Sequence, residues 1–289
     1  MNNNILIIAG MHRSGTSLVS QWLNRCGLHL GEVLLAPSIG NVEGHFEDVD
    51  FYRFHKDVLD SQGFPRCGWL TQPVSPLNSY QKQKLKSVIA FKNRMNAQWA
   101  WKDPRTCLFL SQYREFLPNA HYLHIVRDYK PTVSSMILRD FKRMEIKYFS
   151  RGPISRFIWQ KFRRPRRLEK FYRELSEYYL RIWVTYNEEI LRNIESIDED
   201  SFMMIEYAML LDHDKDIFSR LTQSWHFDLN YFDFRKIFRQ DLLNEPVDVD
   251  RFIRDEGLLK RANEIYTTLK GFATVGSLSG VLARYKHSV

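Results

Sequence analysis

The residues best suited to bind or react with a ligand lie near the N-terminus, in a segment that contains two glycines. Gly10 to Ser17 reads GMHRSGTS, follows an apolar run and opens a helical pattern. Backbone N–H groups in such a turn, together with a helix N-terminus, can cradle a phosphate. Both glycines and the last hydroxyl fit the Walker pattern G-x-x-x-x-G-K-[ST], but Thr16 stands where the lysine belongs. We therefore predict a phosphate site for a donor with less terminal charge than a triphosphate, balanced by Arg13. The alternative is a glycine turn capped by Ser14 or Thr16.

A second group of polar residues follows a later apolar run. Arg127 ends the run HYLHIV at residues 121–126, and Ser135 comes eight residues later, in the first turns of the next predicted helix. Both side chains should lie at the carboxyl edge of a parallel sheet, where open α/β folds bind ligands. A guanidinium and a hydroxyl together suit a phosphate monoester. The alternative is a surface pair between Arg127 and Asp128, with Ser135 as an ordinary residue at a helix start.

Together, these two segments resemble the PAPS-dependent sulfotransferase family, in which 3'-phosphoadenosine 5'-phosphosulfate (PAPS) is the sulfuryl donor. In that family an R-[SP]-G-[TS]-[ST] loop after the first strand binds the 5'-phosphosulfate, and an arginine with a serine eight residues later grips the 3'-phosphate. The first pattern matches RSGTS here, and the second matches Arg127 with Ser135. The resemblance therefore implies a set of donor-binding residues: Arg13, Ser14, Gly15, Thr16, Ser17, Arg127 and Ser135.

The resemblance extends to WKDPR at residues 101–105, which is similar to the K-D-P element of the tyrosylprotein sulfotransferase branch. In that branch the lysine contacts the donor and steadies the transferring group, which implies a catalytic role for Lys102 beside Arg13. From the residues alone, Asp103 and Pro104 have the chemistry of a helix N-cap and a first helical residue. We therefore expect Lys102 in catalysis and Asp103 in capping.

A weaker likeness lies after a later predicted strand. MIEYAMLLDHD at residues 204–214 is similar to the Y-E-x-L-x-x-x-P segment of the family, in which the tyrosine lies near the adenosine. This sequence departs from the pattern, because Glu206 precedes Tyr207 and the proline is missing. An adenosine contact and a place in the core are equal alternatives for Tyr207.

The general base is sought in a segment rich in titratable groups after the first predicted helix. Residues 41–48 read NVEGHFED and resemble the G-[YFHW]-[FW]-E stretch of bacterial relatives, a family that uses either histidine or glutamate as base. We favour Glu47, then Glu43, then His45. A carboxylate can serve if a dry site raises its pKa towards neutrality. The alternative is a solvated acidic loop ahead of a helix that begins near Phe51.

Alternating strands and helices must position these residues. Short apolar runs at 5–9, 98–101, 121–126 and 201–205 predict strands, and patterns of helical spacing separate them. The expected fold is a P-loop-like three-layer α/β domain, with a central parallel sheet of four or five strands flanked by helices. We expect residues 1–289 to form one domain.

Between the third and fourth predicted strands lies a long basic and aromatic stretch, which we assign as a helical insertion at residues 142–195. A long amphipathic helix is expected from Leu168 to about residue 193. The interleaved basic and aromatic residues from Phe157 to Arg173 are compatible with binding to an anionic membrane or nucleic acid. Core packing of the aromatic residues, with a solvated basic face, is the preferred interpretation.

Composition limits the class of partner and the compartment. The chain carries 42 basic and 34 acidic residues, a formal net charge of +8, which favours an anionic partner. The start MNNNILIIAG has no signal-peptide pattern, and no apolar run is long enough to span a membrane. Three widely spaced cysteines argue against a disulfide framework, and the histidines form no metal-binding pattern, so we expect a cytoplasmic protein without a metal.

These inferences converge on a transferase that moves a sulfuryl group from PAPS to an acceptor hydroxyl by in-line displacement. A carbohydrate or lipid-linked acceptor is favoured, and the basic insertion would suit an acidic saccharide, a glycolipid or peripheral membrane contact. No nucleic-acid partner is expected. Two alternatives stay open: a P-loop kinase or NTPase that uses ATP and Mg²⁺, and a non-catalytic binder of anionic membrane or nucleic acid through the insertion.

Overall fold

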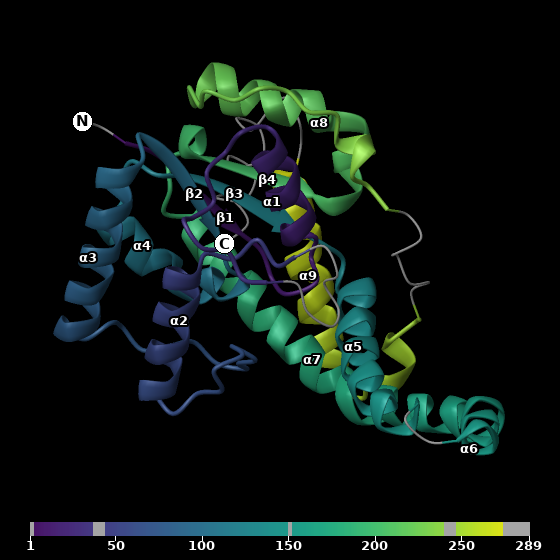
Figure 1. Ribbon diagram of the computed structural model, residues 1–289. Coiled ribbons are helices and arrows are strands. Elements are labelled where there is room, and N and C mark those ends of the chain that lie inside the picture. The colour runs from purple at the N-terminus through teal and green to yellow at the C-terminus, as the bar shows by residue number, and fades with distance from the viewer. Residues whose placement is uncertain (1–2, 37–43, 150–151, 240–246, 274–289) are drawn as a thin grey trace.

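The computed structural model describes residues 3–36, 44–149, 152–239 and 247–273. Its centre is a parallel sheet with the strand order β2-β1-β3-β4 (Figure 1). The strands are β1 (Asn4–Ala9), β2 (Gln98–Lys102), β3 (His121–Val126) and β4 (Phe202–Glu206). The predicted α/β class is therefore confirmed, and within the described residues the sheet has four strands, the lower of the two predicted numbers.

Side chains alternate between two cores because successive residues of a strand point to opposite faces. Ile5 and Ile7 of β1 face a large core shared with α2 (Val49–Ser61), α3 (Ser79–Met95), α4 (Leu110–Phe116), α5 (Tyr129–Phe149), α7 (Arg164–Ile194) and α9 (Glu256–Phe272). Leu6 and Ile8 face a smaller core shared with α1 (Thr16–Arg25) and α8 (Leu210–Ser219). Figure 1 shows α8 and α7 on opposite sides of the sheet, which completes the three layers.

A buried ion cluster fixes the chain ahead of α2. The Lys92 ammonium of α3 is 1% exposed and lies 2.7 Å from Asp48 Oδ2 and 2.9 Å from Asp50 Oδ2, and it also contacts Glu32. Asp48 in addition caps α2, because its carboxylate accepts from the N–H groups of Asp50 and Phe51. The residue just before this cap, Glu47, is thereby held in one place.

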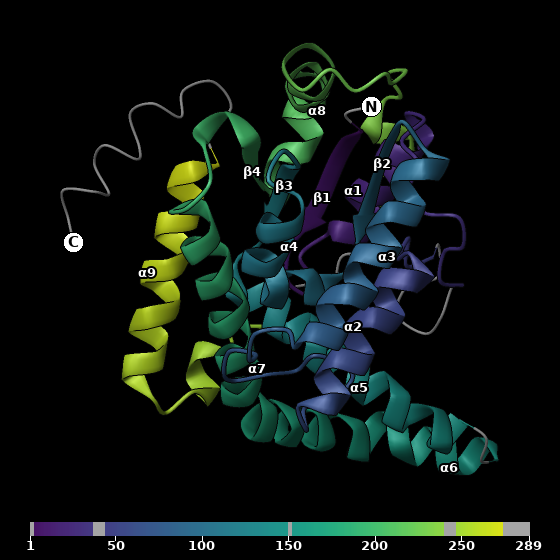
Figure 2. The same cartoon turned by 90° about the vertical axis from the view of Figure 1, so that its left-hand side faces the viewer.

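The predicted insertion at residues 142–195 contains the end of α5, all of α6 (Pro153–Ile158) and all of α7. The C-terminal part of α7 contributes Tyr179, Trp183 and Tyr186 to the large core. Its N-terminal end and α6 extend away from the sheet, as both views show (Figures 1 and 2). One part of the predicted insertion thus builds the core, and the other projects from it.

Two further features concern the cysteines and the possibility of a membrane-spanning helix. Cys26, Cys67 and Cys107 are all free thiols. Across the part of the chain that the structure describes, no helix combines the length and apolar composition needed to cross a bilayer.

Candidate active site

The loop between β1 and α1 has the backbone of a phosphate cradle. Arg13 and Gly15 both adopt left-handed backbone angles, with φ of 68° and 98°. A Cβ atom on Gly10 would lie 2.6 Å from the Ile125 carbonyl oxygen, and one on Gly15 would lie 2.2 Å from the ring of Tyr207. Both glycines are therefore required by close approach, and at Gly15 also by φ. The loop then feeds directly into α1 at Thr16.

The two predicted donor motifs meet at this loop. Arg127, just past the end of β3, donates from Nη1 to the Arg13 carbonyl oxygen at 3.0 Å. Arg13 in turn donates from Nε to the Ser135 hydroxyl on α5 at 2.9 Å. Asp128 accepts a hydrogen bond from the N–H of Lys130 and forms no ion pair with Arg127 among the described residues. The predicted alternative of a surface pair between Arg127 and Asp128 is therefore wrong.

Tyr207 closes one side of the loop. Its ring lies 4.9 Å from the Arg127 guanidinium and packs against Gly15. Tyr207 is the first residue after β4, so the carboxyl ends of β1, β3 and β4 all contribute to the same edge of the sheet. This is the edge at which open α/β folds bind their ligands.

Positive charge is concentrated around the loop. Burial, followed by the charges of Arg139 and Arg127, lowers the pKa of Arg13 to about 10. Burial also lowers the pKa of Arg127. These directions mean that the protonated arginines lose solvation here and that those around Arg13 repel one another. A bound anion would relieve both effects, which makes the loop electrostatically suited to a phosphate group.

Lys102 brings an ammonium from β2 to the start of α1. Its side chain is fully buried at the end of β2, and Nζ lies 3.2 Å from the Ser17 hydroxyl at the start of α1. Nζ also donates to the carbonyl oxygen of His45 and lies 3.0 Å from Glu47 Oε1. The cation at the start of α1 therefore comes from β2 and not from the loop itself, where Thr16 stands.

Of the two candidate bases that the structure describes, Glu47 is the more deeply buried. It is 7% exposed, and its second oxygen lies 3.5 Å from Nη2 of Arg105. His45 Nδ1 lies 3.9 Å from Glu47 Oε1, and burial lowers the pKa of His45 below its ordinary 6.5. Glu43 lies outside the described residues. The alternative of a solvated acidic loop is wrong for Glu47, because two cations and the protein interior surround its carboxylate.

Asp103 caps the 3₁₀ helix Pro104–Phe109, as predicted, by accepting from the N–H of Arg105. It also accepts from Nε and Nη2 of the same arginine, each at 2.8 Å, and lies 3.3 Å from Nδ1 of His55. Burial opposes the ionisation of this carboxyl, but Arg105 and His55 hold the pKa of Asp103 well below its usual range. Asp103 therefore orients Arg105, which in turn contacts Glu47.

Three residues beside the predicted motifs were given no role from the sequence. Arg105 links Asp103 to Glu47. His12 and Arg139 carry side-chain nitrogens, Nε2 and Nη2, that are buried without a hydrogen-bond partner among the residues described. Burial, followed by the charges of Arg105 and Arg139, holds the pKa of His12 well below its ordinary value, so the ring is neutral. The only sequence signal was their position next to or inside the motifs.

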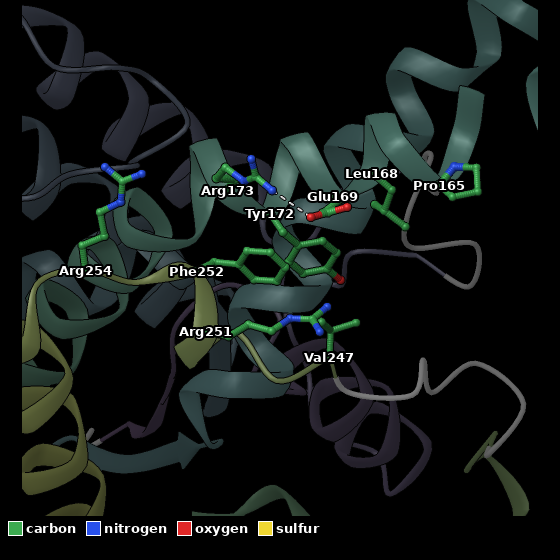
Figure 3. A pocket seen from close by; sticks show the side chains of 9 residues that line it. All are labelled: Pro165, Leu168, Glu169, Tyr172, Arg173, Val247, Arg251, Phe252 and Arg254. Atoms are coloured by element: carbon green, nitrogen blue, oxygen red, sulfur yellow. Dashed lines mark hydrogen bonds and ion pairs between the residues drawn. The ribbon is translucent and has the colours of Figure 1, made fainter. Parts of the chain in front are cut away.

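A pocket of about 730 Å³ lies between the first turns of α7 and the segment 247–254 (Figure 3). The rings of Tyr172 and Phe252 stack in its wall at a centroid distance of 5.5 Å. The Tyr172 hydroxyl lies 2.7 Å from the hydroxyl of Ser134, the residue before Ser135 on α5. Arg251 and Arg254 add positive charge to the lining, in which Arg173 is paired with Glu169 at 2.8 Å.

Comparisons with known proteins bear on the family and the fold. A profile of the sulfotransferase family matches residues 6–231. The crystal structure of sulfotransferase STF9 from Mycobacterium avium superposes with a TM-score of 0.57 at 15% identity, covering 92% of this chain and 76% of that one. Sulfotransferase STF1 from Mycobacterium tuberculosis gives 0.47 at 11% identity, with 91% and 77% covered. No curated protein sequence matches the chain.

Proposed function

The chain belongs to the sulfotransferase family, and on that premise we propose that its site transfers a sulfuryl group from PAPS to an acceptor hydroxyl. The observation that carries the proposal is the hydrogen bond from Arg127 to the Arg13 carbonyl. It brings a loop suited to a phosphosulfate and an arginine suited to a phosphate monoester into contact. One bisphosphorylated nucleotide could then engage both at once.

The donor-binding roles follow from the chemistry of each group. The loop N–H groups and the start of α1 would hold the 5'-phosphosulfate, with Ser14, Thr16 and Ser17 as hydroxyl donors. Arg127 and Ser135 would hold the 3'-phosphate. Tyr207 borders the same space through its contacts with Gly15 and Arg127, which supports the adenosine contact over a purely internal role.

The proposed reaction is an in-line displacement. The acceptor oxygen forms a bond to sulfur, the bond from sulfur to the bridging phosphate oxygen breaks, and adenosine 3',5'-bisphosphate leaves. Lys102 and Arg13 would stabilise the negative charge that builds on the leaving oxygen. Glu47 would receive the acceptor proton, since it lies next to Lys102 and is held in orientation by Arg105. His45 is the second candidate for this step.

An acceptor with acidic groups suits the neighbouring pocket. Stacked aromatic rings can support a sugar ring, and arginines can pair with carboxylate or sulfate groups. The hydrogen bond between Tyr172 and Ser134 joins this pocket to the helix turn that carries Ser135. We therefore propose an acidic saccharide or a lipid-linked saccharide as the acceptor class.

Ligand-dependent thermal unfolding tests the donor class. Adenosine 3',5'-bisphosphate at a hundred times its Kd should stabilise the protein by about 2.7 kcal/mol. ATP with Mg²⁺ should have little effect, because Thr16 replaces the lysine that contacts β- and γ-phosphates. Tight, magnesium-dependent stabilisation by ATP, with none by the bisphosphate, would instead assign the site to a kinase or NTPase.

A further inference from the structure

A projecting arm carries large apolar side chains that are exposed to solvent. We define the arm as residues 152–168, which comprise α6, the turn Trp159–Arg163 and the start of α7. Both views show it extending beyond the body of the protein (Figures 1 and 2). Phe157 and Phe162 are 58% and 57% exposed, and Ile158 is 39% exposed. The preferred interpretation of this segment, aromatic core packing, is therefore wrong for both phenylalanines.

The backbone of the arm is irregular between α6 and α7. Residues 159–163 form a single turn of π-helix, in which the Arg164 N–H bonds to the carbonyl oxygen of Trp159, five residues back. Phe162 lies within this wider turn, and Phe157 lies two residues before it. Lys161 Nζ lies 5.5 Å from the Phe157 ring centroid and 5.6 Å from the Phe162 ring centroid, so one cation contacts both rings.

The arm is anchored to α5 by a compact polar and aromatic cluster. Trp159 is 3% exposed, stacks on Phe141 and donates from Nε1 to Glu145 at 3.2 Å. Arg164 donates from Nε to the same carboxylate oxygen at 2.7 Å. The exposed rings therefore stand on a helix pair with defined packing.

Charge on the arm has one sign. Residues 152–168 contain six basic side chains and no acidic one. Lys161, Arg163, Arg166 and Arg167 form no ion pair among the described residues, whereas farther along α7 Lys170 and Arg173 pair with glutamates. The arm therefore combines basic residues that form no ion pair with exposed apolar side chains.

We propose that this arm docks the protein onto anionic lipid membranes. Phe157, Ile158 and Phe162 would enter the boundary between headgroups and acyl chains, and the surrounding basic side chains would face lipid phosphates. Exposed apolar residues clustered with unpaired cations are typical of membrane-surface contacts. A nucleic acid would use the charge but has no acyl layer for Ile158 and the two phenylalanine rings.

Vesicle co-sedimentation tests the proposal on the full chain. Vesicles of phosphatidylcholine mixed with phosphatidylglycerol should bind the protein, pure phosphatidylcholine vesicles should not, and binding should weaken with salt. Replacing Arg163, Arg166 and Arg167 by glutamine should lower the partition coefficient by about 100-fold. Replacing Phe157 and Phe162 by serine should lower it by at least about tenfold and leave the residual binding more sensitive to salt.

Control substitutions outside the arm distinguish a specific loss of membrane docking from the effect of lower net charge and from misfolding. Lys86, Lys215 and Lys260 are exposed and unpaired in the described structure, so their replacement by glutamine removes the same charge elsewhere and should leave binding within about threefold. Tyr80→Ser removes a 76% exposed ring from α3 as the apolar control. All variants should unfold at the wild-type temperature. Equal loss in both charge triples, no binding to anionic vesicles, or tighter binding of a single-stranded oligonucleotide through the same arm would each overturn the proposal.

Discussion

Lys102 combines full burial with contacts to a serine, a carbonyl and a carboxylate. The Walker lysine reaches its phosphates from the loop itself, but here the loop offers Thr16 and the ammonium comes from β2. A cation on a rigid strand end is fixed before ligand binds, so little reorganisation is needed when charge develops on the leaving oxygen. Loss of the Lys102 ammonium should therefore lower kcat more than it lowers the affinity for the nucleotide.

We predict that Lys102→Ala lowers kcat by about 100- to 1000-fold. Affinity for adenosine 3',5'-bisphosphate should change much less, because the loop, Arg127 and Ser135 remain. Transfer from radiolabelled PAPS to the best of a panel of hydroxyl acceptors gives the rate, and calorimetric titration gives the affinity. Lys86→Ala, on the exposed face of α3, is the control. Near-normal turnover in the Lys102 variant would exclude the catalytic role.

Glu47 and His45 lie so close together that either could act as the general base. We predict that Glu47→Gln lowers the rate by about 100- to 10,000-fold, as expected for loss of a general base, and that His45→Gln lowers it less than about tenfold. The pH profile distinguishes them independently. If His45 were the base, its lowered pKa would place an acid limb below pH 6.5, and His45→Gln would abolish that limb. That result would reverse the assignment.

The turn between β1 and α1 depends on Gly15 for two separate reasons. Its φ of 98° is unfavourable for any other residue, and a Cβ atom would lie 2.2 Å from the Tyr207 ring. Gly27, just after α1, has φ of 99° with nothing within 4 Å of the added atom. The two glycines thus share a φ value but differ in the clash and in their place, at the start of α1 and just after its end.

We predict that Gly15→Ala weakens binding of adenosine 3',5'-bisphosphate by at least about tenfold, because the displaced Tyr207 ring disturbs Arg127 and the loop N–H groups. Gly27→Ala should cost about 1 to 2 kcal/mol of unfolding free energy and leave that affinity unchanged. Titration calorimetry and denaturant unfolding measure the two quantities. Equal affinity loss in both variants would show that a general loss of stability, and not the contact with Tyr207, weakens binding.

At the level of elements, sequence patterns predicted the features that depend on residues close together in the chain. The apolar runs gave the four strands, and the glycine spacing gave the loop, because both depend on residues close in the chain. The pairing of Lys102 with Glu47 joins residues 55 positions apart, and only the resemblance to a family pointed to either. The exposure of Phe157 and Phe162 depends on one π-helical turn, which changes the helical period that the sequence pattern assumes.

On the scale of the molecule, charge is distributed unevenly. The arm holds six of the 42 basic residues and none of the 34 acidic ones, so the rest of the chain carries only +2. The overall charge, which from composition alone indicated an anionic partner of unspecified kind, is therefore largely a property of one projecting segment. The carboxyl edge of the sheet contributes further cations, of which Lys102 pairs with Glu47 and Arg105 with Asp103.

Stability of the whole fold should depend on pH through His124, which lies in β3 at the centre of the sheet. Its side chain is 0% exposed, and neither ring nitrogen has a hydrogen-bond partner among the described residues. Burial lowers the pKa of His124 from 6.5 to about 3. Between these values the unfolded chain binds a proton that the folded protein excludes, so the free energy of unfolding falls as pH falls.

We predict that this one residue contributes a slope of up to about 1.4 kcal/mol per pH unit below pH 6.5. His124→Leu fills similar space without polar atoms, so it should reduce the slope by one proton and leave stability at pH 8, well above the titration, unchanged or higher. Urea unfolding at a series of pH values measures the slope, with His213→Gln on the surface of α8 as the control. If His124→Leu kept the wild-type slope, the acid sensitivity would arise elsewhere, and a neutral imidazole in the core would not limit this fold.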